Sequence, residues 1–491
     1  MPAILGANSA SGAYEVSNSG LFGLAGTFLT RTQSDNESDT DRRKFTFSGW
    51  YKQTLQGSAG GWNGFWSASA DSNNYTSLKL NGDKQLIFGL KISGTEKTFT
   101  LDRRFRDPAA WYNIVVAFDS TDGTAADRVK VYVNGERATG TFSADITQNV
   151  SAHWGDDASA GRVGAYNNNT GGSYMHNGYM ADISLTVGFA LDPTSFGETN
   201  DNGVWIAKRP SVSYSANGFL LEFKQTGTSA DASGLGADTS GNGNHFTIDS
   251  DSISLSSTTD TPTNNFCTMN PILSFDSSDD IDAFTEGNTV VDSNNDTSAA
   301  GSTFGVQDGK WYYEAKLTTG NQSSTNFSTG WCQVDYAGQK GTGNGVGFMT
   351  GEDNASMDPG GNIIWNNSGN GNQQTFGNRS TNDIFQVALD LDNHKMWFGI
   401  NGTWSNGSAS QSTTFNASSP DFSSIFDTAG VDYMPAFAQG SSGRTVLAYN
   451  FGNPSYSIST GHSDDNGYGN FEYEVPSGFY SLCTKNLAEF G

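Results

Sequence analysis

The alternation of apolar and polar positions along the chain is clearest between residues 383 and 402. The apolar side chains of its first half share one face of an extended backbone: Phe385, Val387, Leu389 and Leu391. This period of two predicts a β-strand with one buried face. An Asp-Asn turn and a second apolar stretch follow, and then Asn401-Gly402, a pair that suits a tight turn because both residues tolerate positive φ. The stretch therefore predicts a β-hairpin.

The same order of elements stands earlier in the chain. An apolar stretch at 113–118 ends in Asp119, an acidic loop follows, and a second apolar stretch at 129–133 leads into Asn134-Gly135. Further strand-like stretches recur along the chain, whereas long helical periodicity is missing almost everywhere. A short helical turn is expected around 422–426. The repeated pattern predicts two sandwich domains of related architecture.

Length and composition agree with two domains rich in loops. At 491 residues, the chain exceeds the size at which one hydrophobic core usually keeps growing. Aromatic residues make up 12% of the chain, which supplies a core and argues against disorder despite the 60 glycines. Residues 226–262 hold too few apolar side chains for a core of their own, so we expect a Gly/Ser/Thr/Asp-rich linker or a set of loops laid on a domain.

The net charge of the chain excludes some classes of binding partner. The formal net charge is −25, and such a field repels nucleic acid and anionic membranes, so we expect no nucleic-acid partner. No apolar run is long enough to span a bilayer, and we expect no membrane insertion. The three cysteines are widely spaced and odd in number, which predicts neither a disulfide framework nor a metal knuckle.

The composition is extracellular in style, yet the N-terminal residues lack the basic region and the apolar core of an export signal. A virion protein, made in the host cytoplasm and released by lysis, reconciles the two observations. An export signal missing from the sequence would reconcile them as well. Residues 1–20 are small and polar, and we regard them as a candidate anchor segment.

A series of short pieces in the first half stands in a characteristic order. They are Phe45-Thr-Phe-Ser-Gly-Trp50, Trp111-Tyr-Asn-Ile-Val-Val-Ala, Val131-Tyr-Val-Asn-Gly135 and Gly178-Tyr-Met-Ala-Asp-Ile183. This order resembles the laminin-G-like branch of the concanavalin-A-like lectin/glucanase superfamily, from about residue 20 to residue 225. The resemblance implies a β-sandwich, and in such domains loop carboxylates and carbonyls often bind calcium.

The second half carries a more specific series. It consists of Gly309-Lys-Trp-Tyr-Tyr-Glu-Ala315, Gly345-Val-Gly-Phe348, residues 385–392 with 395–398, Asn401-Gly402, Tyr433-Met-Pro-Ala-Phe437 and Tyr449-Asn-Phe-Gly452. This series resembles the SPRY domain family over most of residues 270–480. The resemblance implies a second two-sheet sandwich that binds protein partners through loops at one end. The pair of modules, joined by residues 260–266, resembles a surface protein of tailed-phage virions, especially of marine phages.

Catalysis is disfavoured, although the superfamily includes glucanases. Retaining glycoside hydrolysis needs two carboxylates about 5–5.5 Å apart, which the family's enzymes carry as Glu-x-Asp-x-x-Glu on one strand face. No such spacing occurs in this sequence. Glu472 and Glu474 share a face of a predicted strand, but they lie in the other domain and are more readily explained as a solvated strand edge. The five histidines form no Ser/His/Asp arrangement. We expect no enzyme.

Calcium is the one cofactor that the resemblance suggests. Asp156 and Asp157, with the asparagines at 167–169 nearby in sequence, could supply oxygen ligands. An acidic chain has Asp in nearly every loop, however, so no metal site is assigned to these residues.

Glycan binding usually places an aromatic face beside amide and carboxylate groups. One candidate set comprises Trp62, Trp66, Asp71, Asn73 and Tyr75, and another comprises Trp154, Tyr166, Asn168 and Tyr174. Packing in a core is the alternative for each tryptophan. In the second half, Trp365 and Trp404 follow loops or turns and are candidates for partner binding, whereas Trp311 and Trp397 belong to motif strands and are expected in the core.

We therefore predict an all-β chain of two antiparallel β-sandwich domains (jelly-roll, concanavalin-A-like) in tandem. The expected division is 1–20, a laminin-G-like sandwich at 21–225, the linker at 226–262 and a SPRY-like sandwich at 263–491.

The expected function is that of a non-enzymatic phage protein on the virion surface, a tail fibre or receptor-binding protein that contacts host surface glycan or an envelope protein through its loops. A head fibre, decoration or connector protein bound to other virion proteins is the alternative, and a polysaccharide depolymerase is the third. Analogy with phage fibres predicts a homotrimer, which neither coiled-coil heptads nor β-helix repeats support.

Overall fold

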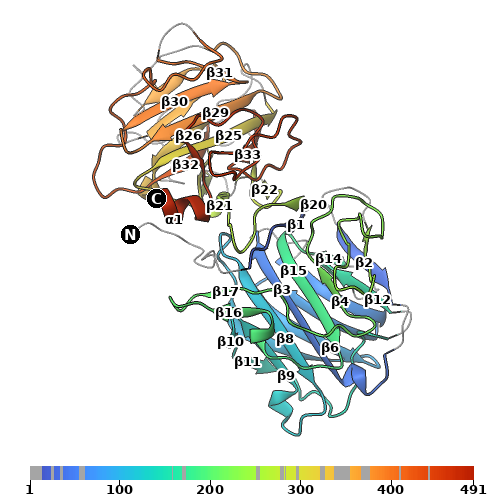
Figure 1. The fold of residues 1–491 in the computed structure, drawn as a ribbon. Helices are drawn as coiled ribbons and strands as arrows, with labels where there is room; N and C mark the ends of the chain where they lie inside the picture. The colour runs from blue at the N-terminus through green and yellow to red at the C-terminus, as the bar shows by residue number, and fades with distance from the viewer. Residues whose placement is uncertain are drawn as a thin grey trace. The chain divides into compact units, whose positions relative to one another are not determined.

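The computed structural model describes residues 14–23, 27–33, 37–54, 61–156, 159–167, 173–249, 255–276, 281, 283–294, 298–320, 327–336, 354–365, 376–407, 411–440 and 443–491. The chain divides between Asn264 and Asn265 into two compact units, called here the first and the second unit. Each unit is an antiparallel β-sandwich (Figure 1), which confirms the predicted fold class.

The first unit consists of two facing sheets and two small hairpins. One sheet contains, in spatial order, β10 (Glu136–Arg137), β9 (Val129–Val133), β8 (Tyr112–Asp119), β3 (Lys44–Gln53), β15 (Gly178–Val187), β1 (Ser19–Phe22) and β20 (Leu255–Thr258), with β18 (Phe219–Leu221) beside β15. The other contains β11 (Gly140–Phe142), β7 (Thr95–Arg104), β6 (Gln85–Ile92), β5 (Asn74–Leu80), β4 (Asn63–Asp71), β12 (Ala160–Val163), β2 (Phe28–Thr32) and β19 (Thr247–Asp249). The hairpins are β13 (Ala165–Asn167) with β14 (Ser173–Met175), and β16 (Gly197–Thr199) with β17 (Trp205–Ala207).

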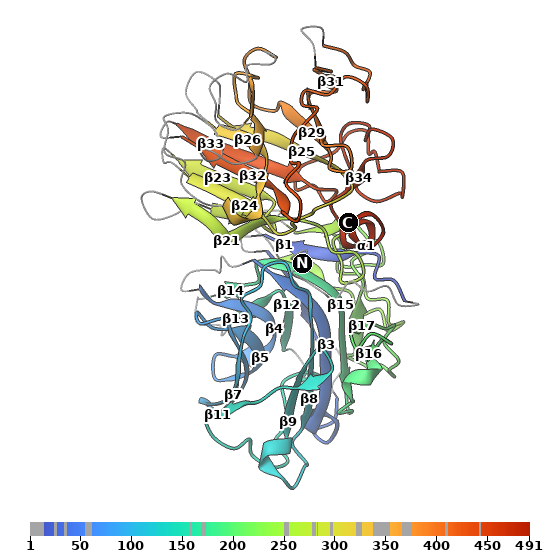
Figure 2. The ribbon, with the colours of Figure 1, turned by 90° about the vertical axis from the view of Figure 1, so that its left-hand side faces the viewer.

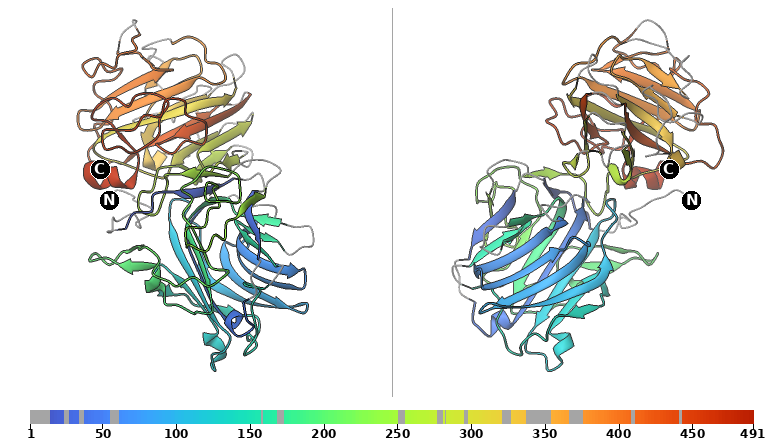
Figure 3. Two further views of the ribbon diagram at one scale, coloured as in Figure 1. Left: turned by 45° about the vertical axis from the view of Figure 1, so that its right-hand side comes forward. Right: turned by 180° about the vertical axis from the view of Figure 1, so that it is seen from behind.

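The two layers of the first unit are seen edge-on in Figure 2, with β4, β5 and β7 in one layer and β3, β8 and β15 in the other. From behind, the blue strands of the second sheet lie side by side across the unit (Figure 3, right). Alternating side chains point between the layers: Phe45 and Phe47 from β3 meet Trp66 from β4, with ring centroids 5.9 and 4.6 Å apart. Such aromatic contacts, together with many buried aliphatic side chains, form the core of the first unit.

The segment at 226–262 belongs to the first unit and does not form a free linker between the units. Leu235, Phe246 and Leu255 are buried in the core of that unit. Asp238 accepts hydrogen bonds from the backbone N–H of Leu220 and of Asn244, at 2.9 and 2.8 Å. Hydrogen bonds from polar side chains thus hold this stretch of low apolar content against the sandwich. The composition of the segment alone does not show this arrangement.

The second unit, drawn in yellow to red in Figure 1, also has two sheets. One contains β21 (Met269–Asp276), β24 (Ser298–Ser302), β32 (Tyr433–Gln439), β26 (Phe327–Gln333), β27 (Asn354–Met357) and β28 (Ile363–Trp365). The other contains β22 (Ala283–Thr285), β23 (Val290–Asn294), β33 (Arg444–Asn450), β25 (Lys310–Thr319), β29 (Ile384–Asp390), β30 (Lys395–Ile400) and β31 (Thr403–Trp404), with β34 (Tyr480–Ser481) parallel to β25.

The predicted hairpins form in both units. β29 pairs with β30 in a register that sets Val387 opposite Phe398, and β8 pairs with β9. Asn401 and Gly402 have φ of 50° and 78°, and Asn134 and Gly135 have 50° and 80°, as the tight turns require.

Helices are few among the described residues. The 3-10 turns are η1 (Asp41–Arg43), η3 (Ala125–Asp127), η4 (Pro193–Ser195) and η5 (Val334–Tyr336), and α1 spans Thr484–Phe490. The helical turn expected at 422–426 is absent, since Phe422 forms a β-bridge with Met396 and Phe426 has a φ of 57°.

Candidate functional site

The structure places the tryptophans of the predicted glycan sites at different depths of the first unit. Trp66 and Trp154 are 0% and 1% exposed and pack against each other in the core, with ring centroids 5.9 Å apart. They cannot stack on a sugar, and this part of the glycan prediction is corrected. The packing alternative holds for both side chains because each lies between the two sheets.

Four further aromatic residues of these sets gather around a lysine. Tyr166 donates a hydrogen bond to the Tyr75 hydroxyl at 3.1 Å and stacks parallel to Tyr174. The Lys79 ammonium lies 4.0 Å from the centre of the Tyr166 ring and 5.6 Å from that of Trp62. Tyr75 and Tyr166 are buried, whereas Trp62 and Tyr174 are half-buried. Only this last pair retains aromatic surface toward solvent.

The polar members of the first set do not join the aromatic pair. Asp71 accepts the backbone N–H of Asn73 at 2.6 Å and closes the turn between β4 and β5. That hydrogen bond, more than any other cause, lowers the pKa of Asp71. Trp62 precedes the opposite end of β4, a strand from Asn63 to Asp71, and at about 3.3 Å per residue the two ends lie about 26 Å apart. The set therefore makes no single site.

In the acidic loop that was considered as a calcium site, Asp156 contacts basic side chains. Asp156 lies 3.1 Å from the Arg42 guanidinium and 3.4 Å from Nδ1 of His153. Asp157 and the asparagines at 168 and 169 fall outside the described residues. Within the described part of the chain, no group of three or more His, Cys, Asp or Glu side chains could hold a metal ion.

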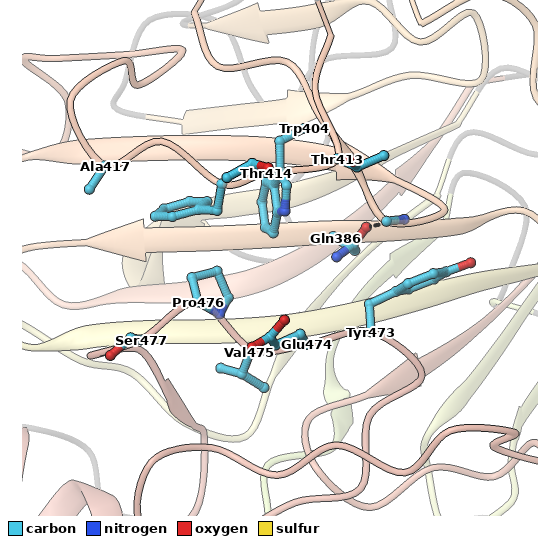
Figure 4. Close-up of a pocket in the computed structure, with 12 residues that line it drawn as sticks. Gln386, Trp404, Thr413, Thr414, Ala417, Tyr473, Glu474, Val475, Pro476 and Ser477 are labelled. Atoms are coloured by element: carbon cyan, nitrogen blue, oxygen red, sulfur yellow. Dashed lines mark hydrogen bonds between the residues drawn. The ribbon is translucent and has the colours of Figure 1, made fainter.

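The second unit has a groove of about 610 Å³ that includes Trp404 (Figure 4). Its lining residues are Gln386, Gly402, Trp404, Thr413, Thr414, Phe415, Ala417, Tyr473, Glu474, Val475, Pro476 and Ser477. Of the two predicted partner-binding tryptophans, Trp404 thus lies in a concave site. Trp365 ends β28, and its side chain falls outside the described residues.

The groove lies between two segments that are distant in sequence. In Figure 4, Gln386 from β29 forms the floor, with Trp404 and residues 413–417 on one side and residues 473–477 on the other. Gln386 points away from the core because its neighbours Phe385 and Val387 point into it. The face opposite the core thus becomes the floor of the groove.

One chain of hydrogen bonds runs beneath this floor. The backbone N–H of Gly402 donates to Oε1 of Gln386 at 2.6 Å, and Nε2 of Gln386 donates to the Tyr312 hydroxyl at 3.2 Å. That hydroxyl donates in turn to Glu314 at 3.0 Å. Because each member has a partner on both sides, the amide of Gln386 is held in one orientation.

Glu314 anchors the far wall of the groove. Its carboxylate is 0% exposed and accepts the backbone N–H groups of Glu472 and Tyr473 at 3.0 and 2.8 Å. Asn450 and Tyr456 donate to it as well. Burial raises the pKa of Glu314 to about 6 against the lowering effect of these donors. A carboxylate so enclosed supports the wall and is not placed to act as a catalytic acid.

Aromatic packing fixes the near wall. Phe415 is half-buried, and its ring lies edge-on to Trp404 with centroids 5.0 Å apart, and 5.2 Å from that of Trp397. Trp397 also donates its indole N–H to the carbonyl of Asn416 at 3.0 Å. The loop at 413–417 therefore rests on the indoles of β30 and β31.

Among the described residues that line the groove, Glu474 alone is charged, and it is exposed. The neighbouring Glu472 points elsewhere, since its carboxylate accepts the backbone N–H of Ser459 at 2.7 Å. The two glutamates thus do not form the strand edge that the sequence predicted, because residues 472–476 lie outside the strands. The lining that the structure describes therefore offers apolar and hydrogen-bonding contacts together with one carboxylate, that of Glu474.

Sequence reasoning found Trp404 but missed the rest of the groove. Phe415 stands alone in a polar loop, and Tyr473 is 69 positions beyond Trp404. An isolated aromatic residue in a Ser/Thr-rich loop was the only available signal.

Two sequence-family models match the chain. That of the concanavalin A-like lectin/glucanases superfamily (laminin G type) covers residues 30–186, and that of the SPRY domain covers residues 310–424. The chain combines a laminin G-like domain with a SPRY domain. The SPRY match contains the floor and the near wall of the groove, whereas residues 473–477 lie beyond its end. Domains of both families are typically non-catalytic binding modules, although the concanavalin A-like superfamily includes glucanases.

Solved structures with similarity to the chain include both domain types. A heptameric SAP-like pentraxin from Limulus polyphemus is 19% identical, over 36% of this chain and 80% of that one, with a TM-score of 0.27. The SPRY domain of human HERC1 is 13% identical over 37% and 96%, with a TM-score of 0.25. Domains LG4-5 of the mouse laminin alpha1 chain are 11% identical over 90% of both chains, with a TM-score of 0.28. No curated protein sequence matches the chain.

Membrane-spanning helices were expected to be absent. Among the described residues, no helix has the length and apolar character needed to cross a bilayer.

Proposed function

We propose that the chain is a non-enzymatic binding protein of the tailed-phage virion surface, of the tail-fibre or receptor-binding type. The observation that carries the binding role is the groove between Trp404 and Tyr473, which has aromatic walls, a fixed amide in its floor and one free-standing carboxylate. Concave, largely apolar sites with a few oriented polar groups are the usual form of a binding site. The groove suits a protein partner, such as an envelope protein of the host.

The virion location is supported by the resemblance of the module pair to surface proteins of tailed phages. A head fibre or decoration protein that grips another virion protein would use the same groove. The position of the chain in a map of the particle separates the two roles, because a capsid position would favour decoration.

Host glycan is the second candidate ligand, and a specific observation favours it. Trp62 and Tyr174 keep part of their rings toward solvent, with centroids 5.7 Å apart. Sugars stack on such exposed aromatic faces. Substituting Trp62 by alanine should then weaken binding to host polysaccharide and leave binding through the groove unchanged.

The adsorption assay tests the main proposal. Labelled full-length chain should bind host cells and compete with phage adsorption, and Phe415→Ala or Tyr473→Ala should weaken this competition about tenfold or more, as for a central aromatic contact. Phe189, which is 48% exposed in the first unit, supplies the matched control, since Phe189→Ala should compete like the unaltered chain. Particles that lack the protein and still adsorb normally would contradict the receptor role. Release of new reducing ends from host polysaccharide would instead reveal a depolymerase.

A further inference from the structure

The charge in the described lining of the groove is negative. Of its lining residues, Glu474 alone is charged, and no cation is among them. The structure gives the Glu474 carboxylate neither a hydrogen bond nor an ion pair among the described residues. Two cations of the second unit are engaged outside the groove lining: Arg379 faces Asp383 at 3.7 Å, and the Lys316 ammonium lies over the Tyr456 ring at 5.1 Å.

Other carboxylates add to the negative field at this end of the groove. The pKa of Tyr473 is raised, first by burial and then by the charges of Glu472, Glu314 and Asp383. The whole chain has a net charge of −25. A cationic group is therefore attracted to this end, and an anionic group is repelled.

The apolar part of the groove lies beside Glu474. Val475 and Pro476 stand next to it on the far wall (Figure 4), and Phe415 is among the residues that line the groove. Trp404 does not offer its flat face to a ligand, because it is 3% exposed and packs against Phe415. An aliphatic side chain fits between such walls. The Thr413 hydroxyl can hydrogen-bond a peptide backbone, whereas the Ser477 hydroxyl donates to Asp465 at 3.0 Å and can only accept.

The dimensions suit an extended segment. A volume of about 610 Å³ holds a few amino-acid residues and lies within the range of ligand pockets. The segments 413–417 and 473–477 lie on opposite sides of the groove (Figure 4). An extended peptide can lie between them without a change in either wall.

We propose that the groove binds an extended peptide segment in which a lysine or arginine stands beside an aliphatic residue. The basic side chain pairs with Glu474, and the aliphatic one packs between Phe415 and Val475. This inference rests on the proposed partner-binding role of the groove and names the chemistry of the partner.

A randomised eight-residue peptide library, selected against the full-length chain, tests the inference. Enriched peptides should carry a basic residue next to an aliphatic one, and Glu474→Lys should weaken the binding of an enriched peptide about tenfold, as for reversal of a charge at a binding rim. Asp427→Lys makes the same change of charge at an exposed position of the second unit outside the groove, and it should leave the affinity unchanged. Both variants should melt like the unaltered chain because both side chains are exposed.

The other outcomes separate the two proposals. Enriched peptides without a basic residue that still depend on Phe415 would overturn the inferred chemistry and keep the groove as a binding site. Peptides that bind equally to the chain and to its Phe415→Ala and Glu474→Lys variants would overturn both. An equal loss with Asp427→Lys would show that the net charge of the unit, and not Glu474, attracts the peptide.

Discussion

Glu314 accepts the backbone N–H of Tyr473 at 2.8 Å, across 159 positions of the sequence. The buried carboxylate thereby sets the position of the groove's far wall. Its pKa is raised from 4.5 to about 6 by burial, so the folded chain holds this proton more tightly than the unfolded chain does. The contribution of Glu314 to stability is therefore present below pH 4.5 and is lost as the pH rises through about 6.

This shift predicts a pH dependence specific to Glu314. A raised pKa of this size is worth about 2 kcal/mol of unfolding free energy between pH 4.5 and pH 7. Urea unfolding at several pH values should show that decline in the unaltered chain and a smaller decline in Glu314→Gln, which cannot ionise. Asp182, whose pKa burial raises to about 7, contributes in the same direction but equally in both chains. Parallel pH profiles of the two chains would refute the prediction.

Lys52 and Asp260 form an ion pair of 2.7 Å with side chains that are 1% and 0% exposed. Lys52→Met should lower the unfolding free energy of the first unit by about 3–5 kcal/mol, because it leaves a buried carboxylate without its cation. Arg104 and Asp83 provide an exposed pair as control, and Arg104→Met should cost less than about 1 kcal/mol. Equal small losses in urea unfolding would mean that Asp260 is satisfied without Lys52.

The different burial of Trp66 and Trp62 predicts losses of stability of different size when each is replaced by alanine. Trp66→Ala should cost about 3–5 kcal/mol because it empties the space between the two sheets. Trp62→Ala should cost about 1 kcal/mol, since it removes only a partly solvated ring and its contact with Lys79. Chemical unfolding followed by circular dichroism measures both. A small loss for Trp66→Ala would restore that side chain as a candidate for glycan stacking.

Gly402 and Gly430 allow a matched test of the groove. Both have a φ of 78°, but a Cβ on Gly402 would stand 2.9 Å from the Tyr473 ring, whereas nothing lies within 4 Å of one on Gly430. Each substitution by alanine should cost about 1–2 kcal/mol for the left-handed backbone. Gly402→Ala should in addition displace Tyr473 and weaken cell binding, while Gly430→Ala should not. Identical binding by both variants would argue against a role for the Tyr473 ring.

The sequence predicted the sandwiches because their signal is local. Alternation over 385–391 and the Asn401-Gly402 turn define a hairpin within some twenty residues, and the structure confirms it. The position of the segment at 226–262 was harder to predict from the sequence, because it depends on hydrogen bonds such as that from Leu220 N–H to Asp238. Such bonds leave no periodic pattern in a sequence.

The groove was predicted only through Trp404. Its far wall is held by Glu314, a residue in the middle of a strand. The sequence does not show that this carboxylate is buried, because its partners lie far away along the chain. Conversely, Trp66 and Trp154 were candidates for glycan stacking because each was grouped with amide or carboxylate residues, and the structure buries both. A side chain on one face of a sheet is buried only if other elements cover that face, and those elements are distant in the sequence.

The far wall at 473–477 begins 49 positions after the last residue of the SPRY match. A recombinant fragment trimmed to the matched segment would also lose the strand β33 and the backbone N–H groups of Glu472 and Tyr473 that donate to Glu314. Such a fragment would expose a charged carboxylate and half of an aromatic cluster, and its failure to bind would say nothing about the intact protein. Dissection of this chain should therefore cut at Asn265 and keep everything that follows.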